Sequence, residues 1–163
     1  MESLVKDSAG VRGFFRLKIR EDDKIVGDSG WFENLVTNVG VSKFLHAFSG
    51  SSGTLQVSHV SVGTGAVPAS DATTLPGEGL QASKRAAVSL ASTIRAASNG
   101  TSTMQFAATL ASSDSFITVA NNISNIGLFN SITNGSLMAG NTYTSSALAT
   151  NQNVEMSYQI RIN

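Results

Sequence analysis

The chain lacks several features on which common functions depend. Its 163 residues include no cysteine, which excludes disulfide bonds and thiolate metal sites. Only two prolines occur, and both lie in one stretch of the chain, at Pro68 and Pro76. No apolar run approaches the roughly 20 residues that a membrane-spanning helix needs, so we expect no membrane partner.

Charged residues are scarce as well. They make up 13% of the chain, about half the usual share for soluble domains. Eleven basic and eleven acidic residues give a formal net charge of zero, which argues against direct binding to nucleic acid, because phosphate recognition needs a basic surface. Ser, Thr, Asn and Gly take the place of charge, and a neutral, hydrogen-bonding surface suits close contact with other protein subunits.

A period of two dominates the sequence and predicts strands. Apolar residues alternate with basic ones over residues 11–20 and with polar ones over residues 154–162. About eight such segments, separated by turn signals, predict an all-β fold with one short helix, an antiparallel β-sandwich of jelly-roll type. We expect a single domain at residues 11–163, preceded by an arm at residues 1–10 that only a partner orders.

Turn residues give the expected order of the strands. Asp22-Asp23 should make a turn, and Asn99-Gly100 and Asn134-Gly135 should each close a hairpin. Strands are expected at residues 11–20, 25–35, 55–62, 86–97, 104–110, 116–120, 123–129, 137–143 and 154–162. Residues 64–81 should form a long irregular loop, and we expect this loop to contact a partner.

One segment has the period of a helix. Thr37 or Asn38 can cap its start, and Gly50 can end it. Its apolar stripe consists of Val41, Phe44, Leu45 and Phe48. Since these residues share one face, the stripe should pack onto a sheet.

The sequence offers no catalytic, cofactor-binding or metal-binding constellation. The two histidines, His46 and His59, are far apart and lack companion ligands at workable spacing. No Gly-x-Ser-x-Gly elbow occurs, and Glu78 is an isolated charge in the loop. We therefore expect no enzymatic activity and no cofactor.

Candidate contact residues lie in the N-terminal strands and in the loop at residues 64–81. The basic residues of the first strand could form a solvated face or, alternatively, a patch that meets an acidic neighbour. Trp31 is a further candidate because tryptophan is enriched at binding hot spots. The residues that we single out are Arg12, Arg16, Lys18, Trp31, Pro68, Leu75 and Pro76.

Three short sequence blocks follow one another along the chain. The first is Asn34-Leu35-Val36-Thr37-Asn38-Val39-Gly40, and the second is Val62-Gly63-Thr64-Gly65 followed by a loop that ends near Leu75-Pro76. The third is Ile123-Ser124-Asn125-Ile126-Gly127-Leu128-Phe129, in which Asn125 replaces the more usual acid. Together and in this order, the blocks resemble those of structural proteins of tailed bacteriophages, namely capsid decoration (cement) proteins and the N-terminal domains of tail-collar fibre proteins.

This resemblance implies a structural role in a virion that is assembled in the host cytoplasm. It implies a homotrimer whose partners are the major capsid protein or other virion proteins. No fibre shaft follows in this sequence, which favours a decoration protein that stabilises the head across capsomers. The alternatives are a tail, collar or baseplate component that anchors a fibre and, more distantly, a module that binds host glycans.

Overall fold

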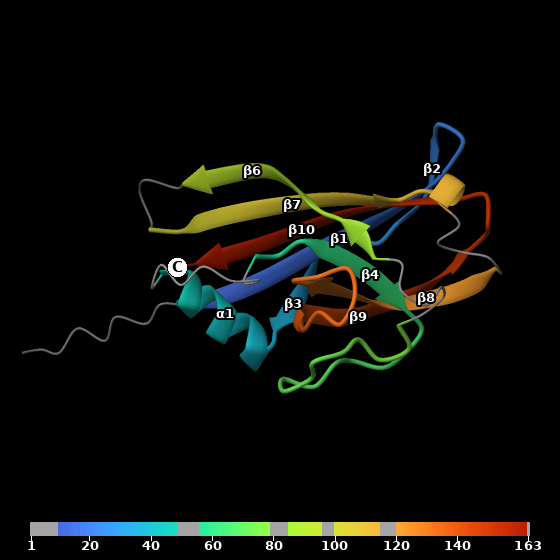
Figure 1. The fold of residues 1–163 in the computed structure, drawn as a ribbon. Coiled ribbons are helices and arrows are strands. Elements are labelled where there is room, and N and C mark those ends of the chain that lie inside the picture. The colour runs from blue at the N-terminus through green and yellow to red at the C-terminus, as the bar shows by residue number, and fades with distance from the viewer. Residues whose placement is uncertain (1–9, 49–55, 79–84, 96–99, 115–119, 163) are drawn as a thin grey trace, which may run out of the picture.

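A computed structural model describes residues 10–48, 56–78, 85–95, 100–114 and 120–162. Figure 1 shows the arrangement of the elements. In chain order they are β1 (Val11–Glu21), β2 (Lys24–Asp28), β3 (Phe32–Val36), α1 (Asn38–Phe48), β4 (His59–Gly63), β5 (Ala86–Ala87), β6 (Ser89–Arg95), β7 (Ser102–Leu110), the 3-10 turn η1 (Ser112–Asp114), β8 (Asn121–Phe129), β9 (Leu137–Leu148) and β10 (Asn153–Ile162).

The described strands form one antiparallel sheet that bends into two layers. Its order is β5-β4-β8-β9-β3-β1-β10-β7-β6, and β2 pairs with the far part of β1. β3 joins the layers because it pairs with β1 through one half and with β9 through the other. The two ends of the path, β5 and β6, are separated in the chain by Val88 alone, so the sheet nearly closes into a barrel. The expectation of an all-β antiparallel fold with one short helix is confirmed.

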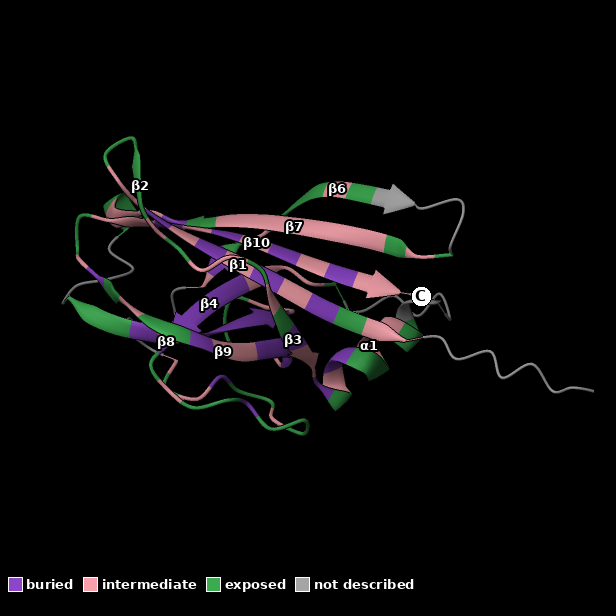
Figure 2. Ribbon diagram, turned by 180° about the vertical axis from the view of Figure 1, so that it is seen from behind, coloured by how far each residue is buried: buried purple, intermediate pink, exposed green. Residues whose placement is uncertain are grey.

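Strict alternation places the core between the layers. Along β1 and β10 every second residue is buried, which Figure 2 shows as alternating colours. The Phe15 ring packs against Phe32, Tyr143 and Tyr158, with ring centroids 5.9 to 6.3 Å apart. Burial raises the pKa of both tyrosines above its ordinary value.

The helix starts where the sequence predicts, but it turns a different face to the sheet. Thr37 caps it, since the Thr37 hydroxyl accepts a bond from the Gly40 N–H at 3.0 Å and donates to the Leu137 carbonyl oxygen at 2.7 Å. Gly40 is buried so tightly that an added Cβ would lie 1.9 Å from the Met138 carbonyl oxygen. Gly40 and Phe44 therefore face inward, one turn apart.

The prediction that the whole apolar stripe packs on the sheet is wrong. Val41 is 37% exposed and Leu45 is 62% exposed, whereas Phe44 is half-buried against the core. The close approach at Gly40 rotates the helix, because backbone-to-backbone contact is possible only on the side that lacks a side chain. Part of the stripe is thereby left facing solvent.

Two substitutions on the helix should distinguish its buried face from its exposed face. We expect Phe44→Ala to lower the free energy of unfolding by about 1–2 kcal/mol, less than for a fully buried phenylalanine. The matched change Leu45→Ala should alter it by less than about 0.5 kcal/mol, because the side chain is exposed. Urea unfolding measures both values, and an equal loss in the two variants would contradict this orientation.

Other expected elements are present, but their bounds differ from those that the sequence predicts. The strand expected at residues 25–35 is split into β2 and β3 at Gly30, whose φ of +70° needs glycine. The Asn134-Gly135 hairpin is present, but its connection spans residues 130–136. The arm at residues 1–10, except Gly10, and the strand expected at 116–120, except Ala120, lie outside the described residues, as do Asn99 and Gly50.

Candidate interaction surface

The basic stripe of β1 lies on the outer face of the sheet, opposite the core. Its members are Arg12, Arg16, Lys18 and Arg20. Arg12 binds Glu33 of β3 at 2.7 Å. Arg20 lies 2.6 Å from Glu155 of β10, an ion pair by distance that lacks hydrogen-bond geometry. Acids on both neighbouring strands thus neutralise the two ends of the stripe.

The middle of the stripe is neutralised from β2. Arg16 donates from Nε to Asp28 at 2.9 Å, and the Gly30 N–H donates to the same carboxylate at 3.0 Å. The hydrogen bond from Arg16 holds the pKa of Asp28 well below its ordinary value, and the bond from Gly30 adds to the effect. Lys18 lies opposite Glu155 in the strand register, and its charge also favours the ionised Asp28. The structure therefore favours a solvated, internally paired face over a patch that awaits acidic partners.

A row of stacked and hydrogen-bonded side chains crosses the same face. Two guanidinium groups lie over the Phe14 ring, with Arg161 4.2 Å and Arg12 5.4 Å from the ring centroid. Arg161 donates to Gln159 at 2.8 Å, and Gln159 donates to Gln105 at 2.8 Å. The outer face is consequently rich in amides and guanidinium groups, and the five cations named on it outnumber the acids Glu33, Asp28 and Glu155 by two.

The predicted contact residues of the loop lie largely inside the subunit. Pro68 and Leu75 are buried, and Leu75 packs with Phe129 and Leu137. Pro76 is half-buried, with its carbonyl oxygen bound to Asn125. Pro68 and Leu75 therefore hold the loop on its own sheet and are not available to a partner in this conformation. Trp31, in contrast, is 44% exposed beside Gly30.

Asn125 is the main anchor of this loop. Its side chain is fully buried on β8, and its Nδ2 donates to the carbonyl oxygens of Ala66 at 3.2 Å and Pro76 at 2.8 Å. These two carbonyls lie on the two limbs of the loop, so one amide joins both limbs to the sheet. A carboxylate cannot donate either bond. The amide at this position therefore has a local structural reason.

Glycines let the two limbs approach each other. A Cβ added at Gly65 would lie 2.3 Å from the Pro76 carbonyl oxygen, and one added at Gly63 would lie 2.6 Å from Asn125 Oδ1. The Thr64 N–H also donates to the Gly77 carbonyl oxygen at 3.3 Å. The described part of the loop, through Glu78, is thus ordered by contacts within the subunit.

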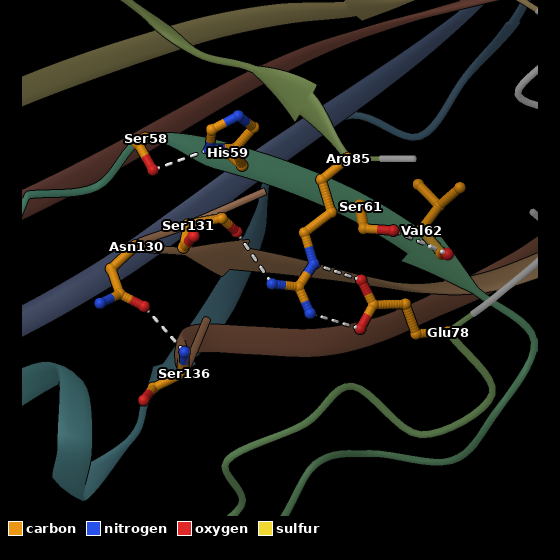
Figure 3. A network of polar contacts seen from close by, with 9 residues as sticks. All are labelled: Ser58, His59, Ser61, Val62, Glu78, Arg85, Asn130, Ser131 and Ser136. Atoms are coloured by element: carbon orange, nitrogen blue, oxygen red, sulfur yellow. Dashed lines mark hydrogen bonds and ion pairs between the residues drawn. The ribbon is translucent and has the colours of Figure 1, made fainter. Parts of the chain in front are cut away.

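Arg85 secures the end of the loop, as Figure 3 shows. Its Nε and Nη2 donate to the two carboxylate oxygens of Glu78 at 2.6 and 2.9 Å, and its Nη1 donates to the Ser131 carbonyl oxygen at 2.9 Å. The guanidinium also stacks 3.4 Å from the centroid of the Phe129 ring. Glu78 is therefore half of a largely buried bidentate ion pair, and its treatment as an isolated charge is wrong.

His59 lies near this ion pair. Its Nδ1 is 2.8 Å from the Ser58 hydroxyl (Figure 3). Burial lowers the pKa of His59, and the positive charge of Arg85 lowers it further, so the neutral imidazole is favoured near pH 7. No described carboxylate contacts His59. The second histidine, His46, is exposed on α1.

The three sequence blocks meet in one place. Gly63 of the second block is paired with Asn125 of the third. The first block joins them where the Asn38 N–H donates to the Ser70 carbonyl oxygen at 2.8 Å. The blocks therefore encode the packing of the loop, the helix start and the sheet.

Large apolar side chains remain exposed over the described surface. They are Ile25, Val26, Trp31, Val41, Leu45, Val67, Leu90 and Ile132. Only Val41 and Leu45 are neighbours on one helix face, four residues apart. Ile25 and Val26 are also adjacent, but successive residues of a strand point to opposite faces, whereas Val41 and Leu45 share one face of α1. The helix pair is therefore the more coherent apolar feature.

Within the described ranges, no three His, Asp or Glu side chains gather so as to hold a metal ion. Nor does any helix there have the length and apolar character required to cross a membrane. Comparison with protein-family models, with curated proteins and with solved structures finds no match to this chain.

Proposed function

We propose that this chain is a non-enzymatic structural protein of a bacteriophage virion. In this proposal it is a capsid decoration protein that binds as a homotrimer across capsomers and strengthens the head. The three blocks that resemble phage structural proteins support the class of protein. The observation that carries the contact surface is the exposed pair Val41 and Leu45 on α1.

The surface chemistry supports binding by shape and apolar contact. The outer-face arginines Arg12, Arg16 and Arg20 already have acidic partners within the chain, so these three charges are compensated within the subunit. Full burial of an exposed large aliphatic side chain contributes roughly 1.5–3 kcal/mol, and Val41 and Leu45, which are 37% and 62% exposed, would each gain part of this. Two such side chains per subunit, multiplied by three in a trimer, would supply a useful part of a stable association.

Binding to heads tests the proposal directly. Purified protein is added to heads from a phage that lacks the corresponding gene, and occupancy is measured by sedimentation and electron microscopy. We expect the double variant Val41→Ser/Leu45→Ser to lose at least about tenfold in affinity while its melting temperature is preserved. Ile25→Ser is the matched control, because Ile25 is 48% exposed on β2, at the opposite end of the molecule from α1 (Figure 1).

The stability of the heads and the site of binding test the proposal further. Heads without the protein should assemble but lose their DNA at lower temperature than decorated heads. Binding to isolated tails and not to heads would move the protein to the tail, collar or baseplate alternative. Equal loss of binding in the Ile25→Ser control would disconnect the function from α1.

Salt dependence gives a second prediction. We expect head occupancy to change by less than about threefold between 50 mM and 500 mM sodium chloride, because screening weakens chiefly exposed charge pairs across an interface. Titration of labelled protein at each salt concentration measures this. A steep loss with rising salt would show that the β1 arginines exchange their internal partners for partners on the head.

A further inference from the structure

An apolar groove lies between α1 and the inner face of β6 and β7. Its volume is about 430 Å³. The apolar side chains that line it are Phe44, Val57, Val88, Leu90, Met104 and Phe106. Leu90 is 60% exposed there, an unusual position for a leucine on the inner face of a sandwich.

The topology explains why the described residues leave this groove uncovered. Met104 and Phe106 alternate in phase with Leu110, which is buried in the core, so they face the inside of the sandwich. The second layer ends here, since β5 stops at Ala87 and the chain crosses through Val88 to β6. The inner face of β6 and β7 therefore extends past its cover.

We propose that the N-terminal arm of the same chain, residues 1–9, binds in this groove and places Leu4 and Val5 against its apolar side chains. These nine residues lie outside the described part of the chain. Leu4-Val5 is their one pair of adjacent large apolar residues, and Gly10 precedes β1. The proposal concerns the subunit alone and is independent of the virion assignment.

The arm joins β1 close enough to the groove for Leu4 and Val5 to reach it. Val11 is packed against the core and lies opposite Ile162, which lies opposite Ser102 on β7. Met104 is two residues further along β7. The distance from Val11 to Met104, two strand spacings across the sheet and two residues along β7, is therefore about 12 Å. The six residues from Val5 to Val11 can span up to about 20 Å.

A short tether also favours the subunit's own arm over the arm of a second copy. A segment tied nearby acts at an effective concentration in the millimolar range, which a second copy in dilute solution does not reach. The sequence alone assigned the ordering of this arm to a partner. The groove instead offers it a binding site within the subunit.

Disulfide trapping tests the proposal, because the chain has no cysteine of its own. The double variant Val5→Cys/Leu90→Cys is oxidised at micromolar concentration and examined on a non-reducing gel and by mass spectrometry of digested protein. The control is Val5→Cys/Ser113→Cys. Ser113 is exposed on η1, three residues after Leu110. Leu110 pairs with Val154 of β10, and Val154 pairs with Ile19 of β1. Ser113 therefore lies near the end of β1 that is far from the arm.

We expect the intrachain disulfide to form at least about tenfold faster in the Leu90 pair than in the control, in line with a high local concentration. Both partner positions are exposed, so neither substitution should compromise folding. Equal rates in the two variants would overturn the proposal. A disulfide-linked dimer from the Leu90 pair would also overturn it and assign the groove to the arm of a second copy.

Leu4→Asp/Val5→Asp, made in the cysteine-free chain, provides an independent readout. Charged residues cannot occupy an apolar groove at low cost, so this variant should bind an apolar fluorescent dye several-fold more than the parent chain. Unchanged dye binding would contradict the proposal. The melting temperature, measured in parallel, identifies any general unfolding.

Discussion

Asn125→Asp should be among the most destabilising single substitutions in this protein. We expect a loss of about 3–5 kcal/mol in the free energy of unfolding at pH 7, the range for an uncompensated buried charge. The new carboxylate would face the carbonyl oxygens of Ala66 and Pro76, to which Asn125 now donates. The two limbs of the loop would lose their common donor.

The matched control is Asn121→Asp on the same strand. Asn121 is exposed, and its side-chain oxygen accepts a bond from the Asn122 N–H, which an aspartate can keep. This variant should remain within about 0.5 kcal/mol of the parent chain. Chemical unfolding of the three proteins in parallel measures both effects, and similar losses in the two variants would refute the role of Asn125.

The Asn125→Asp effect should also depend on pH. Burial would raise the pKa of the introduced carboxyl above its unfolded value, because the neutral form is favoured and can still donate one hydrogen bond. A raised folded pKa stabilises the fold below the unfolded pKa, and this contribution is lost as pH rises through the folded pKa. The difference between variant and parent should therefore grow from about pH 4 upward. A constant difference across this range would contradict the argument.

Gly40→Ala should be the second large effect. The added Cβ would lie 1.9 Å from the Met138 carbonyl oxygen, and a backbone atom of a central strand cannot move aside cheaply. We expect a loss of about 3 kcal/mol, at the upper end for an overpacked site, although alanine is the better helix former. Ser42→Ala, on the exposed side of the same helix, should leave stability unchanged or slightly raised.

Thermal and urea unfolding distinguish these outcomes. If Gly40→Ala were neutral, the helix would not lie against β9 as the structure has it, and the exposure of Val41 and Leu45 would lose its explanation. The binding surface proposed on α1 depends on this orientation. The stability measurement is therefore a prerequisite for interpreting the head-binding experiment.

The candidate site was only partly predictable from the sequence. Trp31 was singled out by residue type and is exposed, but Pro68 and Leu75 were chosen for their place in a loop and turned out to be buried. A loop that contains proline and glycine does not reveal whether it projects or folds back. Here it folds back because of Asn125 and Arg85, which are 40 residues apart in the chain.

The basic stripe illustrates the same limit. Alternation showed that the arginines of β1 share one outward face, and the structure agrees. Their acidic partners, however, come from three other strands, with Glu33 on β3, Asp28 on β2 and Glu155 on β10. Only the strand order determines whether such a stripe attracts a partner or is neutralised within the chain.

The sequence by itself determined the type and approximate place of most described elements and the inward faces of the strands. Side-chain alternation, the turns at Asp22-Asp23 and Asn134-Gly135 and a helix cap at Thr37 or Asn38 are local features, and local sterics and hydrogen bonding are sufficient to specify them. The tertiary structure alone decided which face of α1 is buried, where the long loop lies and where the inner face of β6 and β7 remains open. Those outcomes depend on contacts between residues far apart in the chain, such as Gly40 with Met138, which no local pattern records.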